Sequence, residues 1–310
     1  MEQEYILHNC NSFDPVHIFE CGQCFRWNKE IDGSYTGVFK SNVVNVKKEN
    51  DSVIFKGISQ GDLKQECIEY FDLERNYENI KSKLSKVDDN LKNSIKYGSG
   101  IRILNQDLWE TLISFIISAN NNIPRIKGII ERLSKNYGNK IIWNNKEYYT
   151  FPTSEELSKA SVSDLRKLGL GFRDIRVYET TKMINENKQR LQKLENEKDV
   201  NKLREELLEF PGVGPKVADC IMLFSTLKRL EVFPIDVWVR RVMNDLYIKN
   251  KNENKVSKKQ ILDIANIKFG DIHVFFIARI GLHYKKTALH IGKVCLGFSI
   301  CIYPISKSCL

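Results

Sequence analysis

The sequence predicts an α+β protein: a small N-terminal antiparallel β-sheet domain followed by a mostly helical core with a helix-hairpin-helix motif. Residues 34–57 alternate enough to form two or three strands, whereas from about residue 60 onward the apolar residues recur at helical spacing. A chain of 310 residues can bury a full core in two or three subdomains. We expect a sheet domain with a flanking helix over 1–95, a helical core over 96–271 and an atypical tail over 272–310.

The predicted elements follow one another in a simple order. Together with residues 1–30, the strands within 34–57 form an antiparallel sheet up to about residue 60, with a turn at 48–51. The helical part is predicted to contain a strongly apolar helix, an amphipathic helix, two helices that begin with capping residues, and a charged, solvated helix or its exposed end. These segments are, in the same order, 101–118, 123–137, the helix starts at 152–157 and 161–164, and 186–202.

The segment 201–226 is predicted to form two helices joined by a glycine hairpin. Its first helix spans 201–210 and ends at a Pro-Gly pair, and Pro215 suits the first turn of the second helix. Gly212 and Gly214 allow a positive φ and a close approach of the backbone that a side chain would block. Such a hairpin points backbone N–H groups outward beside the positive end of a helix dipole, which suits a phosphate. The alternative is a plain linker without a ligand.

Two side chains near the hairpin have the chemistry for a reaction on a sugar. Lys216 opens the second helix, and Asp236 follows it twenty residues later. A lysine that loses its proton can attack the C1′ carbon of a deoxyribose and form an imine, which permits β-elimination, while a carboxylate stabilises the cationic transition state. The alternatives are a solvated lysine and an N-cap for a helix over 237–246, and the aspartate could serve both as cap and in catalysis.

The composition indicates which partner and which location to expect for the protein. The net charge of +9 suits a polyanionic partner, but five of these charges belong to basic residues of the tail, which contains no acid. No apolar run reaches membrane-spanning length and the N-terminus lacks a signal-peptide pattern, so we expect a cytoplasmic monomer, nucleoid-associated if bacterial, that is not secreted. The eight cysteines are then expected as thiols, and Cys21 and Cys24 have no second pair at zinc spacing. We therefore predict no metal and no cofactor.

The hairpin, with Lys216 after it and the Pro-x-Asp element of 233–237, resembles the helix-hairpin-helix Gly/Pro-Asp DNA glycosylase superfamily. The resemblance covers roughly residues 1–271 and is closest to the branch of 8-oxoguanine DNA glycosylase/AP lyases. It implies that Lys216 and Asp236 meet in space, that the base is flipped out and that the lysine forms a Schiff base at C1′. It also implies that the partner is duplex DNA containing a damaged base, 8-oxoguanine opposite cytosine. Only three cysteines follow Asp236, at wide spacing, so no iron–sulfur cluster is expected.

Two residues are assigned to the base pocket by this resemblance. The segment 19–27, FECGQCFRW, is similar to the family's GQ-x-FRW segment, in which the glycine carbonyl accepts a hydrogen bond from N7–H of the oxidised base. Gly22 occupies that position, and normal guanine would present an acceptor there. Cys220 matches the pocket cysteine that packs on one face of the base. The alternatives are a turn glycine and a small buried hydrophobe.

Two further segments are assigned to the DNA around the extruded base. The segment 115–126 resembles the family's triple-asparagine segment, in which Asn120, Asn122 and Arg125 would fill the vacated space and contact the widowed cytosine. The segment 168–173, LGLGFR, resembles the family's LGYR segment; Phe172 would be the wedge in the base stack and Arg173 would reach the cytosine. Taken without the resemblance, the asparagines indicate a helix break.

The tail does not fit this pattern. The family's last helix supplies a glutamine to the base edge and a phenylalanine to its second face, but no glutamine follows Gln260, and neither Phe275 nor Phe276 can be matched. Divergence, an unusual pocket or a reading-frame change after Asp271 would each explain the loss of acids. Two other functions stay open: a glycosylase for other damaged bases such as alkylated purines, against which Lys216 argues, and a non-catalytic helix-hairpin-helix DNA-binding protein.

Overall fold

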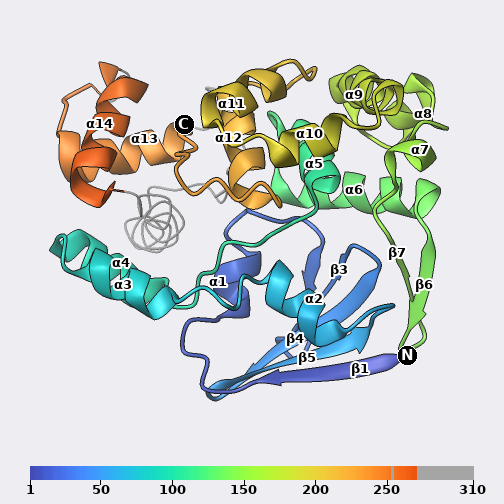
Figure 1. Cartoon of the computed structure of the whole chain (residues 1–310), viewed down its shortest axis with the longest axis horizontal. Helices are drawn as coiled ribbons and strands as arrows, with labels where there is room; N and C mark the ends of the chain where they lie inside the picture. Colours follow the sequence, from blue (N-terminus) through green and yellow to red (C-terminus); the bar gives the residue numbers. More distant parts are fainter. Residues whose placement is uncertain (253–254, 271–310) are drawn as a thin grey trace, which may run out of the picture.

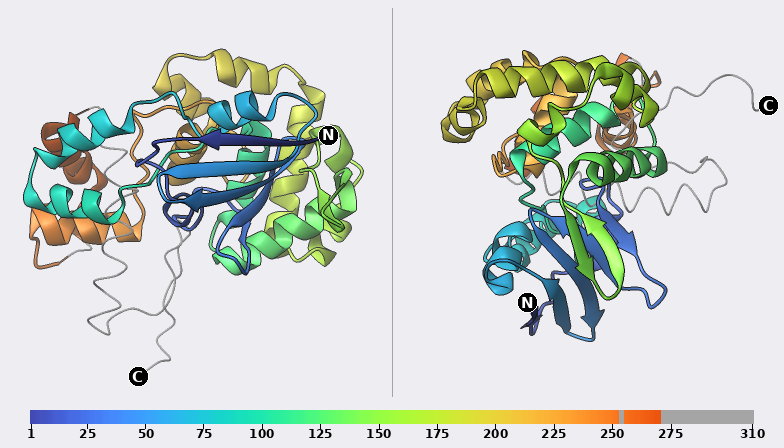
Figure 2. Two further views of the ribbon diagram at one scale, coloured as in Figure 1. Left: turned by 90° about the horizontal axis from the view of Figure 1, so that it is seen from below. Right: turned by 90° about the vertical axis from the view of Figure 1, so that its right-hand side faces the viewer.

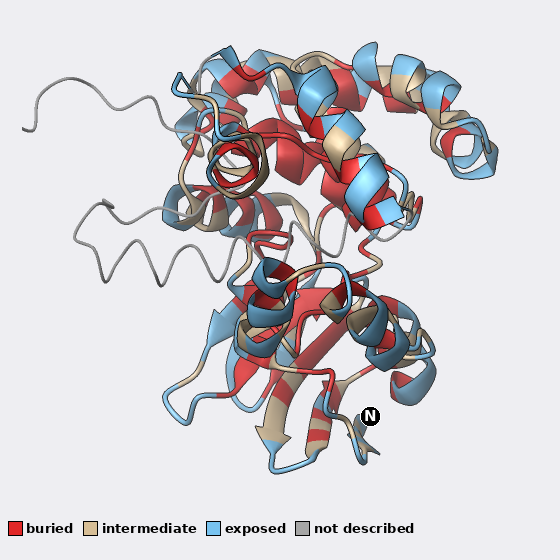
Figure 3. Cartoon of the chain, turned by 90° about the vertical axis from the view of Figure 1, so that its left-hand side faces the viewer, coloured by how far each residue is buried: buried red, intermediate tan, exposed pale blue. Residues whose placement is uncertain are grey.

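A computed structural model describes residues 1–252 and 255–270 as a sheet domain packed beneath a larger helical part (Figure 1). The predicted tail, 272–310, lies outside the described residues. Buried residues lie within both parts, so each has a core of its own (Figure 3). The predicted α+β class is confirmed. No described helix is long and apolar enough to span a membrane.

The sheet has five antiparallel strands in the order β1-β5-β4-β3-β2. Their bounds are β1 Glu2–Leu7, β2 Trp27–Lys29, β3 Tyr35–Phe39, β4 Asn42–Glu49 and β5 Ser52–Ile58. Three of them arise from 34–57 as predicted, and the β4–β5 turn follows Glu49, with Asn50 at φ +53°. Along β5, Val53 and Phe55 are fully buried, while Ile54 between them is half-buried and Lys56 after them is exposed, which is the alternation of a sheet with one covered face.

The covered face of the sheet holds an aromatic core beneath helices α1 and α2 (Figure 1). Trp27 stacks on Phe19 with ring centroids 4.2 Å apart, and its indole N–H donates to the Tyr70 hydroxyl at 3.0 Å. Trp27 therefore fixes the end of the segment that the sequence assigned to the base pocket, because its ring is held between α1 and α2.

The helical part is built from short helices around the buried α5 and α12. The helix bounds are α1 Pro15–Phe19, α2 Leu63–Tyr70, α3 Tyr77–Ser85, α4 Asp89–Tyr97, α5 Leu108–Ser118, α6 Ile123–Tyr137, α7 Ser154–Leu157, α8 Val162–Lys167, α9 Asp174–Glu186, α10 Arg190–Asn196, α11 Val200–Leu208, α12 Pro215–Phe224, α13 Val237–Met243 and α14 Lys258–Phe269, with a 3₁₀ turn at Gly171–Arg173 and a π-helical turn at Asn244–Ile248. The amphipathic helix over 123–137 is confirmed as α6. Capping boxes open α7 at Thr153 and α8 at Ser161, where the sequence placed helix starts.

The predicted apolar helix over 101–118 is wrong in its first seven residues, because α5 begins at Leu108. The Asp107 carboxylate caps α5 by accepting the backbone N–H of Glu110 at 2.8 Å. The preceding segment is buried and extended between the two parts of the molecule, and the backbone N–H of Gln106 bonds to the carbonyl of Phe224 at the end of α12 at 3.1 Å. Burial on all sides gives a continuous apolar run whether or not the chain is helical, and this caused the error.

A two-stranded hairpin, β6 Lys140–Trp143 and β7 Lys146–Tyr149, was not predicted. Asn144 and Asn145 form its turn, both with positive φ (49° and 58°), as a two-residue type I′ turn requires. Trp143 packs against Val38 and Val43 of the main sheet, so the hairpin extends from the helical part down along the sheet (Figure 2, right). The signal was an Asn-Asn pair flanked by β-forming residues.

Helices α3 and α4 lie beside α13 and α14 rather than over the sheet (Figure 1). Leu84 and Leu91 join the core of the helical part, and the hydroxyl of Tyr247 bonds to Asp88, the N-cap of α4, at 3.4 Å. By packing, these two helices belong with the helical core, although the sequence grouped them with 1–95. The charged segment 186–202 forms α10 and the start of α11, with a break between them.

Candidate active site

The predicted hairpin joins α11 to α12. Its first helix ends at Leu208, two residues before the predicted end, and Pro215 is the first residue of α12 as expected. The prediction of a positive φ is confirmed for Gly212, at +87°, and is wrong for Gly214, which has an extended backbone at φ −96°. Gly214 is instead the N-cap of α12, and a Cβ there would meet no atom of residues 1–252 and 255–270 within 4 Å.

Lys216 and Asp236 act on each other electrostatically across the gap between α12 and α13. The Asp236 carboxylate caps α13 by accepting the backbone N–H of Val239 at 2.8 Å, so the predicted N-cap is confirmed. The residue is only 9% exposed, and this burial raises the pKa of Asp236 even though the Val239 N–H and the positive charge of Lys216 act in the opposite direction. The buried carboxylate of Asp236 is thus within electrostatic range of the Lys216 amine.

Gly22 lies in a buried turn with φ +85°, a conformation that favours glycine. The neighbouring Gln23 holds this turn: its amide nitrogen donates to the carbonyls of Ile18 and Arg102 at 3.0 and 2.8 Å, and its amide oxygen accepts the N–H of Leu104 at 3.0 Å. A fully buried amide with all three bonds made fixes the backbone next to Gly22.

A second glutamine connects this turn to the hairpin helix. The side chain of Gln106 donates to the carbonyl of Gln23 at 2.7 Å and to the carbonyl of Phe224 at the end of α12 at 3.0 Å. Cys220, fully buried on α12, and Lys216 at its start are therefore carried on a helix whose position relative to Gly22 is set by Gln106. The sequence analysis identified the Gly22 turn and the hairpin helix, but not Gln106, which connects them.

The triple-asparagine segment forms the sharp turn between α5 and α6, so the predicted helix break is confirmed. Asn120 is exposed with φ +52°, and the side chain of Asn122 caps α6 by accepting the N–H of Arg125 at 2.9 Å. Arg125 is exposed, and its guanidinium donates to the carbonyl of Gly169 at 3.3 Å. The turn therefore lies beside the loop that carries Phe172.

The loop before α9 carries two predicted DNA contacts, of which one side chain is exposed and the other is buried. The Phe172 ring is 53% exposed, as a wedge for a base stack would be. Arg173 is only 2% exposed and donates to the carbonyls of Ala119 and Asn120 at 2.8 and 2.6 Å. In this structure Arg173 fastens the two loops to each other, and contact with a cytosine would require the side chain to leave these carbonyls.

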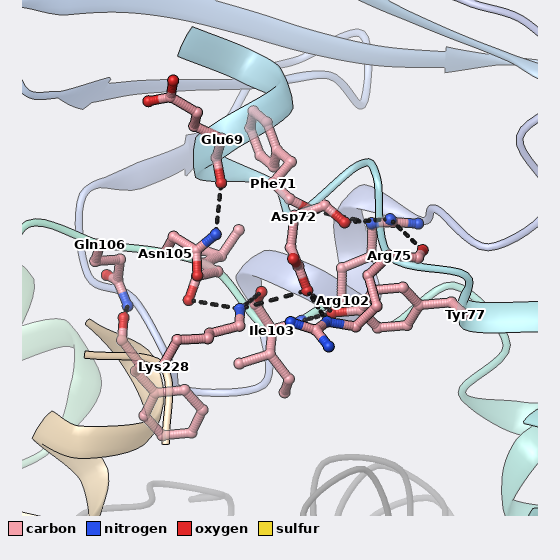
Figure 4. A network of polar contacts seen from close by, with 12 residues as sticks. Glu69, Phe71, Asp72, Arg75, Tyr77, Arg102, Ile103, Asn105, Gln106 and Lys228 are labelled. Atoms are coloured by element: carbon pink, nitrogen blue, oxygen red, sulfur yellow. Dashed lines mark hydrogen bonds and ion pairs between the residues drawn. The ribbon is translucent and has the colours of Figure 1, made fainter. Parts of the chain in front are cut away.

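The joint between the sheet domain and the helical part contains a polar network around Lys228 (Figure 4). The Lys228 amine lies 3.6 Å from the Asp72 carboxylate and donates to the carbonyls of Ile103 and Leu104. Burial lowers the pKa of Lys228 to about 7, outweighing the opposing effect of Asp72. Arg102 donates to the carbonyl of Asp72 at 2.5 Å, so the network closes on itself.

Two family models match successive parts of the chain: the N-terminal domain of 8-oxoguanine DNA glycosylase over residues 5–112 and the HhH-GPD superfamily of base excision DNA repair proteins over residues 113–266. The N-glycosylase/DNA lyase of Saccharomyces cerevisiae is 33% identical over 267 residues, which are 78% of this chain and 70% of the yeast protein. The chain belongs to the 8-oxoguanine DNA glycosylase/lyase family.

Solved members of this family share the fold over nearly the whole chain. MBOgg1, solved in complex with a low-affinity DNA ligand, is 42% identical with a TM-score of 0.86, covering 92% of this chain and 96% of its own. The Clostridium acetobutylicum 8-oxoguanine glycosylase/lyase, solved with double-stranded DNA containing cytosine opposite 8-oxoG, is 40% identical with a TM-score of 0.84, covering 93% and 98%.

The candidate residues lie on four segments that are far apart in the sequence: the Gly22 turn, the asparagine turn, the Phe172 loop and the hairpin with Asp236. Among the described residues, no three His, Cys, Asp or Glu side chains are grouped as metal ligands. Sequence reasoning missed Gln106 and Arg176, which contact the predicted segments. Gln106 had no signal beyond its place in a buried segment, whereas Arg176 lies three residues after Arg173 on the next helix.

Proposed function

We propose that this protein is a bifunctional DNA glycosylase and AP lyase that excises 8-oxoguanine opposite cytosine from duplex DNA. The observation that carries the proposal is that the positive charge of Lys216, at the start of α12, acts on the buried carboxylate of Asp236 in a chain of this family. A purely hydrolytic glycosylase for alkylated purines has no need of this amine, and a non-catalytic DNA-binding hairpin needs neither side chain.

Recognition depends on the Gly22 carbonyl and the buried thiol of Cys220. The oxidised base has a hydrogen on N7 that the Gly22 carbonyl accepts, whereas guanine has an acceptor there, and leaving both groups unpaired costs about 1–3 kcal/mol. Gln23 prevents the turn from relaxing to avoid that cost, because its three hydrogen bonds hold the neighbouring backbone.

Extrusion of the base leaves a gap in the duplex that exposed side chains fill. Phe172 enters the base stack as the wedge, and Asn120, Asn122 and Arg125 occupy the space on the side of the cytosine. These side chains come from two adjoining loops that Arg173 and Arg125 fasten together, so the gap-filling groups approach the DNA as one unit.

The chemical steps use Lys216 and Asp236. The neutral amine of Lys216 attacks C1′, the C1′–N9 bond breaks, and the base leaves with the electron pair and takes up a proton. The Asp236 carboxylate stabilises the positive charge that develops on the sugar ring. Ring opening gives a protonated imine between C1′ and the lysine; loss of a proton from C2′ then breaks the C3′–O bond and releases the 3′ phosphate.

Borohydride trapping on a duplex with one 8-oxoguanine opposite cytosine tests this proposal. The wild-type protein is expected to form a covalent adduct that Lys216→Gln abolishes, because the glutamine amide cannot form an imine. Lys202→Gln, the same exchange on the exposed face of α11, is the matched control and should keep the adduct.

The outcomes separate the candidate functions. An adduct that persists in Lys216→Gln would show that another amine is the nucleophile. DNA binding without any adduct in the wild type would favour the non-catalytic reading, and release of an alkylated purine without trapping would favour a hydrolytic glycosylase.

A further inference from the structure

Arg176 on α9 contacts both the exposed ring of Phe172 and the hairpin. Its guanidinium carbon lies 5.1 Å from the centre of the Phe172 ring. A Cβ built on Gly212 would lie 2.6 Å from Cδ of Arg176 and 3.3 Å from both Nε and Nη1. Residues 172 and 212 are forty positions apart, so this one side chain bridges two segments that the proposed function places on the DNA.

The absence of a side chain at Gly212 is what permits this contact. With φ +87° the hairpin turns in a conformation that glycine favours, and the Arg176 stem occupies the space that a Cβ would fill. The glycine therefore serves both the local turn and a long-range contact, which gives the guanidinium a defined place between the hairpin and the ring.

The charge of Arg176 is not neutralised by nearby carboxylates. Asp174 pairs with Arg166 at 2.6 Å, and Asp219 pairs with Arg204 at 2.9 Å. Within residues 1–252 and 255–270, no carboxylate lies within ion-pair distance of Arg176, and its side chain makes no hydrogen bond. Since Asp174 and Asp219 are engaged elsewhere and no other described carboxylate lies within ion-pair distance, the five N–H donors of Arg176 remain available.

Arg173 differs from Arg176 although both lie against the same ring. The guanidinium carbon of Arg173 is 4.2 Å from the ring centre, but its donors are used by backbone carbonyls of the asparagine turn and it is buried. Arg173 thus anchors the ring to the protein, whereas Arg176 is partly exposed and keeps its donors for another partner.

We propose that Arg176 binds a backbone phosphate of the DNA between the wedge and the hairpin, and that it orients Phe172 through its cation–π contact when the phosphate is bound. A planar guanidinium can donate two parallel hydrogen bonds to one phosphate while its face stays on an aromatic ring. The inference rests on the proposed function for the presence of duplex DNA at these two segments. It makes Arg176 a positioning residue that links docking of the hairpin to insertion of the wedge.

The salt dependence of DNA binding provides the test. We would measure binding by fluorescence anisotropy in the Lys216→Gln background, on a duplex with one 8-oxoguanine opposite cytosine and on the undamaged duplex. Each phosphate contact contributes about 0.9 to the slope of log K against log salt concentration, so Arg176→Gln should lower the magnitude of that slope by about this amount. Lys182→Gln, which removes an exposed charge further along α9, is the matched control and should leave the slope unchanged.

A second variant separates the effect of the positive charge from the effect of the planar guanidinium that lies on the Phe172 ring. Arg176→Lys should restore the salt slope but not the orientation of Phe172. Fluorescence of 2-aminopurine placed beside the lesion, which rises on extrusion, should therefore be reduced in both variants. Thermal unfolding checks the fold, and we expect no change because the Arg176 side chain makes no hydrogen bond to another described residue.

The possible results are distinct. An unchanged slope in Arg176→Gln would overturn the inference, even if the wild type excises 8-oxoguanine. A reduced slope on both duplexes in a protein that does not excise 8-oxoguanine would overturn the proposed function while leaving the phosphate contact in place.

Discussion

The two ends of α12 each carry a lysine beside a carboxylate, and the two pairs have opposite settings. At the start of the helix, Lys216 is partly buried and its charge acts on the buried carboxylate of Asp236. Beyond its end, the side chain of Lys228 is 13% exposed, lies 3.6 Å from Asp72 and donates to two backbone carbonyls.

The difference shows that a lowered lysine pKa does not by itself identify a nucleophile. A strongly perturbed pKa is a common sign of a functional group, and Lys228, with a pKa of about 7, has that sign. Its amine, however, is bound by the carbonyls of Ile103 and Leu104 in the joint between the sheet domain and the helical part (Figure 4). Lys216 is the candidate because it opens the helix that follows the hairpin and its charge acts on the buried carboxylate of Asp236.

The largest effect is expected at the hairpin end. Asp236→Asn should lower the single-turnover rate of base excision by about 100-fold or more, because the amide cannot stabilise the positive sugar, while DNA affinity is largely retained. Asparagine is as good an N-cap as aspartate, so α13 should persist. Asp199→Asn, the same exchange at the N-cap of α11, is the matched control and should leave the rate unchanged.

The excision rate should depend on pH through the same carboxylate. Burial raises the pKa of Asp236, so on acidification it becomes neutral at a higher pH than an ordinary aspartate, and the excision rate should fall there. Single-turnover rates across acidic pH would show this limb in the wild type. If Asp236→Asn keeps both the rate and the limb, the carboxylate has no part in the reaction.

A smaller effect is expected at the joint, on stability instead of chemistry. The pKa of Lys228 is about 7 when folded and near its usual 10.5 when unfolded. Between these values the unfolded state binds more protons, so the free energy of unfolding should rise with pH by up to about 1.4 kcal/mol per pH unit. Below pH 7, Lys228 should make the free energy of unfolding neither rise nor fall with pH.

Urea unfolding of the wild type and of Lys228→Met at pH 6 to 10 measures this contribution. As pH rises from 7 to 10, the wild type should become more stable relative to Lys228→Met. Parallel curves would contradict the assignment. Lys228→Met should still form the borohydride adduct, which would sharpen the contrast with Lys216.

The smallest effects are expected from alanine substitutions at the two hairpin glycines, and they should differ between the two positions. Gly212→Ala should destabilise the fold by about 1–3 kcal/mol, since alanine at φ +87° is strained and its methyl would displace Arg176. Gly214→Ala should leave unfolding unchanged, because its backbone is extended and the space is open, but it should weaken DNA binding where a phosphate approaches. Urea unfolding and anisotropy measure the pair; equal destabilisation by both would refute the distinction.

Sequence reasoning succeeded where a structure depends on residues close together in the chain. The N-caps at Thr153, Ser161 and Asp236 are local, because each joins a side chain to a backbone N–H three residues later. It failed where a distant segment decided the outcome: residues 101–107 are extended because Gln106 pairs with the end of α12, and Gly214 needs no positive φ because the turn is completed at Gly212.

The amino-acid sequence by itself determined the α+β class, the hairpin, the capped helices and the residue types of the candidate site, since patterns of period two, helical spacing and caps act within a few residues. Only the tertiary structure decided that the charge of Lys216 acts on a buried Asp236, that Arg173 turns inward while Arg176 stays partly exposed, and that burial lowers the pKa of Lys228. Electrostatic interaction and desolvation depend on distances in space, and the residues concerned are brought together only when the sheet domain and the helices pack.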